Sequence, residues 1–168
     1  MFCENKSICF FGDSNTNEGK YISYLREFFS KNQIRVHLFN NGIGGTRIDM
    51  LKNIVEEELD MYTPDFAVLS YGTNDLGIWL YGKDRVLDEE DKLEIERRIN
   101  LYAESLENMV KLLKSKNIMP IVFSPFCVNE NITEREGIVK REEGFYKIAE
   151  NYNGKIEELR EKILALKF

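Results

Sequence analysis

The sequence predicts an α/β fold, namely a doubly wound, flavodoxin-like, three-layer α/β/α domain with a parallel sheet. Short apolar runs alternate with amphipathic runs along the 168 residues, and this alternation is typical of parallel strands joined by helices. The length suits a single domain over residues 1–168 with a sizeable core. We therefore expect one sheet with functional loops beyond the carboxyl ends of its strands.

Four apolar runs predict strands, and their apolar residues on both faces are typical of buried parallel strands. These strands are Ser7–Phe11, Ile34–Asn40, Asp65–Tyr71 and Ile118–Ser124. Apolar residues at helical spacing predict helices at Glu18–Ser30, Thr46–Leu59, Asp88–Lys116 and Phe145–Leu166. The last helix should lead into a fifth strand. We expect that strand to be missing and the domain to be incomplete at its C-terminal end.

Composition excludes several classes of function. The net charge is −6 and 43% of the residues are hydrophobic, so the chain lacks the basic surface that nucleic-acid binding requires. No apolar run approaches the roughly 20 residues of a membrane span, and no signal peptide precedes the first strand. The three cysteines, Cys3, Cys9 and Cys127, lack the spacing of a disulfide framework or a zinc site. These features predict a cytoplasmic protein without a metal.

Three polar loops, Gly12–Thr16, Asn41–Thr46 and Tyr71–Asp75, follow predicted strands and should meet at one edge of the sheet. Each has a simple alternative explanation, because helix caps and turns also use Ser, Asp, Gly and Asn. Together, however, the loops deliver a serine, a glycine pair and an asparagine to one edge. Acyl transfer requires such a nucleophile and such hydrogen-bond donors.

The motifs Gly-Asp-Ser, Asn-x-Gly-x-Gly-Gly-Thr and Gly-Thr-Asn-Asp resemble the first three blocks of the SGNH (GDSL-type) hydrolase family. The resemblance covers residues 7 to about 126. It implies a serine esterase acting on a small acyl ester without a cofactor. Ser14 would be the nucleophile, and the N–H groups of Ser14 and Gly45 with the amide of Asn74 would form the oxyanion hole. Further candidates for substrate binding or for shaping the loops are Asp13, Thr16, Gly44, Arg47 and Asp75.

Two expectations concern individual side chains beside these loops. Arg47 is a candidate for contact with an anionic group of a substrate, and Asp75 is expected to organise the third loop. Trp79 and Tyr81 follow that loop, where they either line an acyl pocket or close the edge of the core.

The resemblance also reveals a missing part, because members of the family carry an Asp-x-x-His block after the fifth strand. The only histidine, His37, lies inside a predicted strand and is not expected to act as the base. We therefore expect this chain to be inactive or weakly active alone. One alternative is a non-catalytic module of the same fold that binds a carboxylate or an acylated ligand. A flavodoxin-like flavin-binding protein is a more distant one. The uncovered edge of the fourth strand predicts a homo-oligomer.

Overall fold

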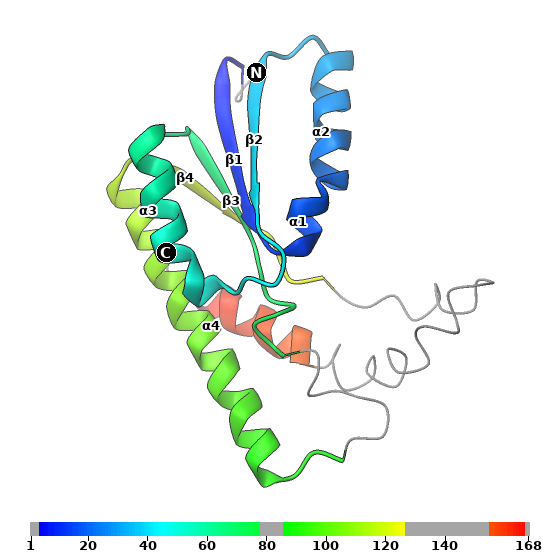
Figure 1. Cartoon of the computed structure of the whole chain (residues 1–168), viewed down its shortest axis with the longest axis vertical. Coiled ribbons are helices and arrows are strands. Elements are labelled where there is room, and N and C mark those ends of the chain that lie inside the picture. Colours follow the sequence, from blue (N-terminus) through cyan, green and yellow to red (C-terminus); the bar gives the residue numbers. More distant parts are fainter. Residues whose placement is uncertain (1–3, 78–85, 127–154, 167–168) are drawn as a thin grey trace, which may run out of the picture.

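The computed structural model describes residues 4–77, 86–126 and 155–166. Four parallel strands form one sheet in the order β2-β1-β3-β4. Their bounds are Lys6–Gly12 for β1, Val36–Gly42 for β2, Phe66–Ser70 for β3 and Met119–Val122 for β4. Each strand overlaps the run that the sequence predicts, and the three-layer α/β/α class is confirmed (Figure 1).

Helices connect the strands at the expected places. They are α1 (Ser14–Glu18), α2 (Lys20–Lys31), the short 3₁₀ helix η1 (Ile48–Met50), α3 (Leu51–Met61), α4 (Glu89–Ser115) and a helix at residues 155–165. The predicted helix Glu18–Ser30 corresponds to α2, and the short helix α1 before it was not predicted; Gly19, in a left-handed conformation with φ of 69°, ends α1. Residues 145–154 of the predicted last helix lie outside the described residues.

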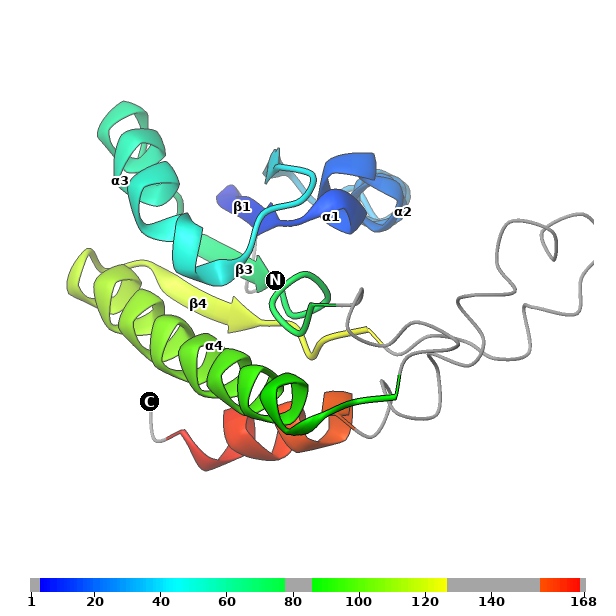
Figure 2. The same cartoon turned by 60° about the horizontal axis from the view of Figure 1, so that its bottom comes forward.

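The sheet separates two cores. On one face α2 packs over Ile8, Phe10 and Val68 through Ile22. On the other face, α3, α4 and the helix at 155–165 bury a larger cluster (Figure 2). The central strands β1 and β3 are therefore covered on both sides, as buried parallel strands are.

The edge strands differ from the sequence prediction. Both β2 and β4 consist of exposed and half-buried residues, whereas burial on both faces was expected. The reason is their position in the sheet, since each pairs with a single described strand. Met119 and Ile121 of β4 are 53% and 37% exposed, so this edge presents apolar side chains to water.

The long helix α4 contributes side chains to a polar cluster beside the loops at the carboxyl edge of the sheet. It begins at a capping box, in which the side chain of Asp88 accepts the N–H of Asp91 and the side chain of Asp91 accepts the N–H of Asp88. Acidic residues in its first turn suit the helix dipole. Within the described part of the chain, no helix is apolar over enough length to cross a membrane.

Candidate active site

The first loop places a serine hydroxyl at the surface. Asp13 is the N-cap of α1, and its Oδ1 accepts hydrogen bonds from the backbone N–H and the side-chain amide of Asn15 at 2.9 and 3.1 Å. Burial raises the pKa of the Asp13 carboxyl above its ordinary value, although both bonds act against the shift. Ser14 follows as the first residue of the helix and is exposed. Asp13 therefore shapes the turn that presents Ser14, as expected.

Thr16 lies behind this turn and not at the open site. Its side chain is fully buried, and its hydroxyl forms a hydrogen bond with the hydroxyl of Tyr21 at 2.9 Å. A Cβ at Gly12 would come within 2.0 Å of Thr16 Oγ1, and one at Gly42 within 2.8 Å of its Cβ. Of the two roles considered for Thr16, substrate binding and shaping the loops, its burial favours the second, because the two glycines let its side chain pack between the ends of β1 and β2.

The second loop approaches Ser14 at Gly44, a residue without a side chain. Its first N–H, from Ile43, donates to the carbonyl of Gly12 at 2.9 Å and ties the loop to the end of β1. A Cβ at Gly44 would meet Ser14 Cβ at 3.9 Å, so these two residues are neighbours. Gly45 has φ of 79°, and no heavy atom lies within 4 Å of its Cβ position. The loop therefore leaves open space at Gly45, one residue after the neighbour of Ser14.

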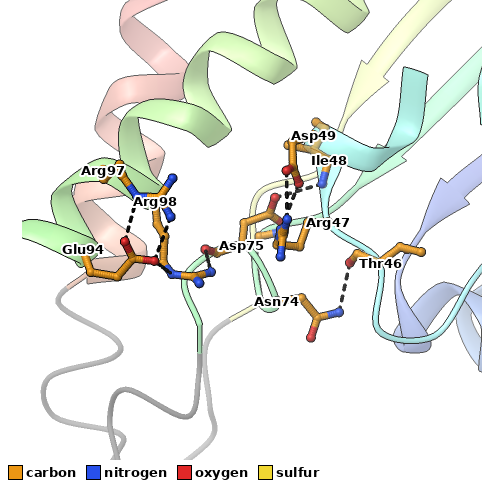
Figure 3. Close-up of polar contacts among 10 residues, drawn as sticks. Thr46, Arg47, Ile48, Asp49, Asn74, Asp75, Glu94, Arg97 and Arg98 are labelled. Atoms are coloured by element: carbon orange, nitrogen blue, oxygen red, sulfur yellow. Dashed lines mark hydrogen bonds and ion pairs between the residues drawn. The ribbon is translucent and has the colours of Figure 1, made fainter. Parts of the chain in front are cut away.

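Asn74 joins the third loop to the second. Its Nδ2 donates to the backbone carbonyl of Thr46 at 3.0 Å, which fixes the orientation of the side-chain amide next to Gly45 (Figure 3). A primary amide carries two N–H donors, and this bond uses one of them. The half-buried Asn74 can thus present its second donor to an acceptor near the same loop.

Asp75 lies beneath these loops and is 6% exposed. Its Oδ1 accepts the N–H of Ile48 from the second loop, and its Oδ2 accepts the N–H of Gly72 from its own loop, both at 2.9 Å. Burial raises the pKa of this carboxyl to about 6, against the opposing effect of the two N–H groups. The expected organisation of the third loop by Asp75 thus extends to the second.

Arg47 is paired within its own loop. Its guanidinium donates two hydrogen bonds to the carboxylate of Asp49, Nε to Oδ1 and Nη2 to Oδ2, each at 2.9 Å. This pairing holds the pKa of Asp49 below its usual value. An anionic substrate group would have to compete with Asp49, so the structure gives Arg47 a loop-stabilising partner that the sequence analysis did not identify.

The same cluster includes side chains from α4. Arg98 Nη1 donates to the backbone carbonyl of Asp75 at 3.3 Å, and Arg98 Nε lies 2.8 Å from Glu94 Oε1. Arg47, Asp49, Asp75 and Arg98 line a small cavity of about 130 Å³. The sequence carries one signal for part of this arrangement, because Glu94 and Arg98 have the spacing of a helical ion pair.

His37 lies at the opposite end of the sheet. It is exposed on the edge strand β2 and pairs in register with Ser7, at the start of β1. Gly42, which pairs with Gly12 at the site edge, lies five residues further along β2. At about 3.3 Å per residue, this separation is roughly 16 Å, beyond the reach of a hydrogen bond to Ser14.

Trp79 and Tyr81 lie outside the described residues, as do Cys3 and Cys127. Cys9 is a buried free thiol whose pKa burial raises to about 12. No group of three or more potential metal ligands gathers within residues 4–77, 86–126 and 155–166.

The family of the chain follows from a match over nearly its whole length. The family model described as GDSL-like Lipase/Acylhydrolase matches residues 8–166. The chain belongs to this family. That result confirms the SGNH (GDSL-type) resemblance of the three loops. No curated protein matches the chain in sequence.

Solved structures of other proteins share the fold. A gut microbial diltiazem-metabolizing enzyme is similar with a TM-score of 0.74 and 21% identity, over 98% of this chain and 36% of that one. Axe2, an acetylxylan esterase from Geobacillus stearothermophilus, gives a TM-score of 0.60 and 19% identity, over 95% of this chain and 74% of its own. The acetyl xylan esterase AlAXEase gives 0.57 and 22%, over 94% and 80%. The chain thus spans about a third of the first of these relatives.

Two further Axe2 structures are of catalytic mutants, in which an aspartate and a histidine three positions apart are each replaced by alanine. That spacing is Asp-x-x-His. No Asp-x-x-His occurs in the 168 residues of this chain, whose single histidine lies at the far end of the sheet.

Proposed function

We propose that this protein is a serine hydrolase of the carboxylic-ester class, with Ser14 as nucleophile and a small acyl ester as substrate. One observation carries the proposal: Ser14, Gly45 and Asn74 belong to the three loops that follow β1, β2 and β3, and these parallel strands end at the same edge of the sheet. Gly44 is a neighbour of Ser14, and Asn74 donates to Thr46, so the second loop lies beside both the first and the third. The family match and the esterases among the similar structures support the same class of reaction.

The proposed reaction has two steps, acylation of Ser14 and hydrolysis of the acyl-serine. Ser14 Oγ attacks the carbonyl carbon of the ester as a base removes its proton, and the negative charge moves to the carbonyl oxygen. The N–H groups of Ser14 and Gly45 and the second N–H of the Asn74 amide would bind that oxyanion, and one such donor contributes about 3–4 kcal/mol. The leaving alcohol departs with the proton. Water then attacks the acyl-serine in the same way, which releases the acid and restores the hydroxyl.

The chain provides the nucleophile and the donors for these steps but no imidazole near Ser14. A serine hydroxyl is a weak nucleophile without a base, and removal of the histidine from a serine protease lowers turnover by about 10⁶. We therefore infer that the chain alone is nearly inactive, and that a base supplied from outside residues 1–168 would activate it. The open space beside Gly45 and the exposure of Ser14 would admit a small base.

Free imidazole provides the test. Hydrolysis of p-nitrophenyl acetate is measured against imidazole concentration for the parent chain, Ser14→Ala and His37→Ala. Because imidazole itself cleaves this ester, Ser14→Ala defines the background slope. We expect the parent and His37→Ala to show the same slope, well above that background. Equal slopes for the parent and Ser14→Ala would reject the proposed role of Ser14.

A second candidate is a non-catalytic module that binds a carboxylate or an acylated ligand, and the position of His37 favours it. Such a pocket needs donors and no base. Treatment with a short acyl phosphonate in the presence of imidazole separates the two functions. A covalent adduct on Ser14 supports the hydrolase, whereas reversible acetate binding without an adduct supports the module.

The exposed edge strand β4 provides a further proposal, self-association of the chain. Met119 and Ile121 would become buried if a second copy covered this edge. We expect sedimentation to show a dimer whose population rises with concentration and falls in Ile121→Lys. A monomer at every concentration would contradict it.

A further inference from the structure

The donors of the proposed oxyanion hole lie on different loops. Gly45 belongs to the loop after β2, and Asn74 belongs to the loop after β3. Oxyanion stabilisation depends on donors fixed in advance at the right positions, because an error of about 1 Å can lower a rate 10²-fold. Some interaction must therefore hold these two loops in register.

We propose that Asp75 is a positioning residue that fastens the two loops together, so that the Gly45 N–H and the Asn74 amide converge on one oxygen atom. Asp75 itself touches neither Ser14 nor, in the proposed reaction, the substrate. This inference rests on the proposed esterase function for its catalytic consequence. The structural part of the inference is that one carboxylate fixes the position of the second loop relative to the third. That part holds whether or not the chain turns over a substrate.

The hydrogen bonds of Asp75 have the form that this role requires. One carboxylate oxygen accepts from Ile48, two residues after Thr46, whose carbonyl orients Asn74. The other oxygen accepts from Gly72, two residues before Asn74. The same side chain thus bonds close to both ends of the Asn74–Thr46 contact, and Figure 3 shows Asp75 beside Asn74 and Ile48. An ionised carboxylate is an acceptor at both oxygens, whereas an asparagine would direct an N–H group at one of the two donors.

Helix α4 connects this arrangement to the body of the fold. Arg98 donates to the carbonyl of Asp75, and the ion pair with Glu94 fixes the guanidinium on the helix. Because α4 packs into the larger core, the position of Asp75 is set by the helix as well as by the loops. The titratable or charged groups around Asp75 are Arg47 and Asp49 from the second loop, Tyr71 from its own loop, and Glu94, Arg97, Arg98 and Tyr102 from α4.

The protonation state of Asp75 should affect both loops. Its pKa is raised to about 6 by burial, and the nearby charge of Asp49 acts in the same direction. Below that pH the carboxyl gains a proton and offers only one good acceptor to two N–H donors. The geometry of Asn74 should then loosen in acid, although Asn74 carries no titratable group.

An NMR titration of the 168-residue chain tests this coupling without requiring activity. The probes are the backbone N–H signals of Ile48 and Gly72 and the side-chain amide signals of Asn74. We expect all three to shift with a common midpoint near the Asp75 pKa of about 6. They should cease to do so in Asp75→Asn. If Ile48 and Gly72 titrate while Asn74 does not, the carboxylate fails to reach the donor and the proposal is rejected.

Kinetics in the presence of imidazole test the catalytic consequence. We expect Asp75→Asn to lower kcat on the order of 10²-fold with little change in KM, since the loss concerns the oxyanion and not ground-state binding. Asp65→Asn is the matched control, because Asp65 lies at the opposite end of β3 and bonds to Lys6 and Ser7, and it should retain the parent kcat. An unchanged kcat in Asp75→Asn would overturn the catalytic consequence. A parent chain without Ser14-dependent activity would instead reject the proposed function, and the titration would still decide the role of Asp75.

Discussion

Two aspartates flank strand β3, and their environments are opposite. Asp65 precedes the strand, where its carboxylate accepts bonds from Lys6 Nζ, the Ser7 N–H and the Ser7 hydroxyl at 2.8 to 2.9 Å. Asp75 follows the strand and accepts two backbone N–H groups at 2.9 Å. The bonds to Lys6 and Ser7 lower the pKa of Asp65 to about 2, whereas burial raises that of Asp75 to about 6.

The difference shows how the two ends of one sheet are used. At the amino end an aspartate joins β1 to β3 in contact with water and a cation, so its charge costs little. At the carboxyl end a similar aspartate joins two loops in a buried place, where its carboxylate accepts two uncharged backbone N–H groups. A carboxyl whose pKa is raised by burial is typical of functional sites, which agrees with the proposed site at the carboxyl edge.

The largest expected effect is on activity at the carboxyl end. Asn74→Ala removes the side-chain donor and should lower the imidazole-dependent rate by about 10²–10³, equivalent to roughly 3–4 kcal/mol. Ser7→Ala, at the amino end, removes a hydrogen bond of Asp65 and should leave this rate unchanged. Steady-state hydrolysis of p-nitrophenyl acetate by both variants decides the matter. Equal rates for the two variants would remove the functional distinction between the ends.

The next effect is on the pH dependence of stability. Because the folded pKa of Asp75 lies above that of an unfolded aspartate, its contribution is complete below about pH 4 and is lost as the pH rises through about 6. A shift of about two pKa units corresponds to roughly 3 kcal/mol in the free energy of unfolding. Urea unfolding from pH 4 to 7 should show this decline in the parent, and Asp75→Asn should lack it. The same decline in both proteins would contradict the assignment to Asp75.

A slightly smaller effect concerns packing at the same edge. Gly72 has φ of 134°, and a Cβ there would lie 2.6 Å from the Pro125 ring. Gly72→Ala should therefore lower the free energy of unfolding by roughly 2–3 kcal/mol. Gly44→Ala is the control, since its Cβ would meet only Ser14 at 3.9 Å. Denaturant unfolding of both variants measures the difference, and equal losses would show that the edge is less tightly packed than its contacts indicate.

Much of the carboxyl end could be predicted from the sequence because its signals are local. A strand followed by Gly-Asp-Ser, and another followed by Gly-Thr-Asn-Asp, determine both the fold and the order of the loops. The position of His37 within a strand, and so away from Ser14, was predicted correctly for the same reason.

Contacts between distant residues could not be predicted in this way. The bond from Asp75 to Ile48 joins residues 27 apart, and nothing in either segment indicates the other. The burial of Thr16 depends on how Gly12 and Gly42 meet in the sheet, and the exposure of β2 and β4 depends on strand order. Helical spacing indicated Glu94 and Arg98 as a pair, but not that Arg98 reaches Asp75.

The smallest expected effect completes the comparison of the two aspartates. The lowered pKa of Asp65 means that its contribution to stability is present above about pH 4 and is lost as the pH falls through about 2. The side chains of Asp65 and Lys6 are 34% and 46% exposed, and solvent screening limits the effect to less than about 1 kcal/mol. Asp65→Asn should therefore flatten acid unfolding between pH 2 and 4, where Asp75→Asn has little effect. If Asp65→Asn instead removed the decline in the free energy of unfolding above pH 4, that decline would arise from Asp65 and not from Asp75.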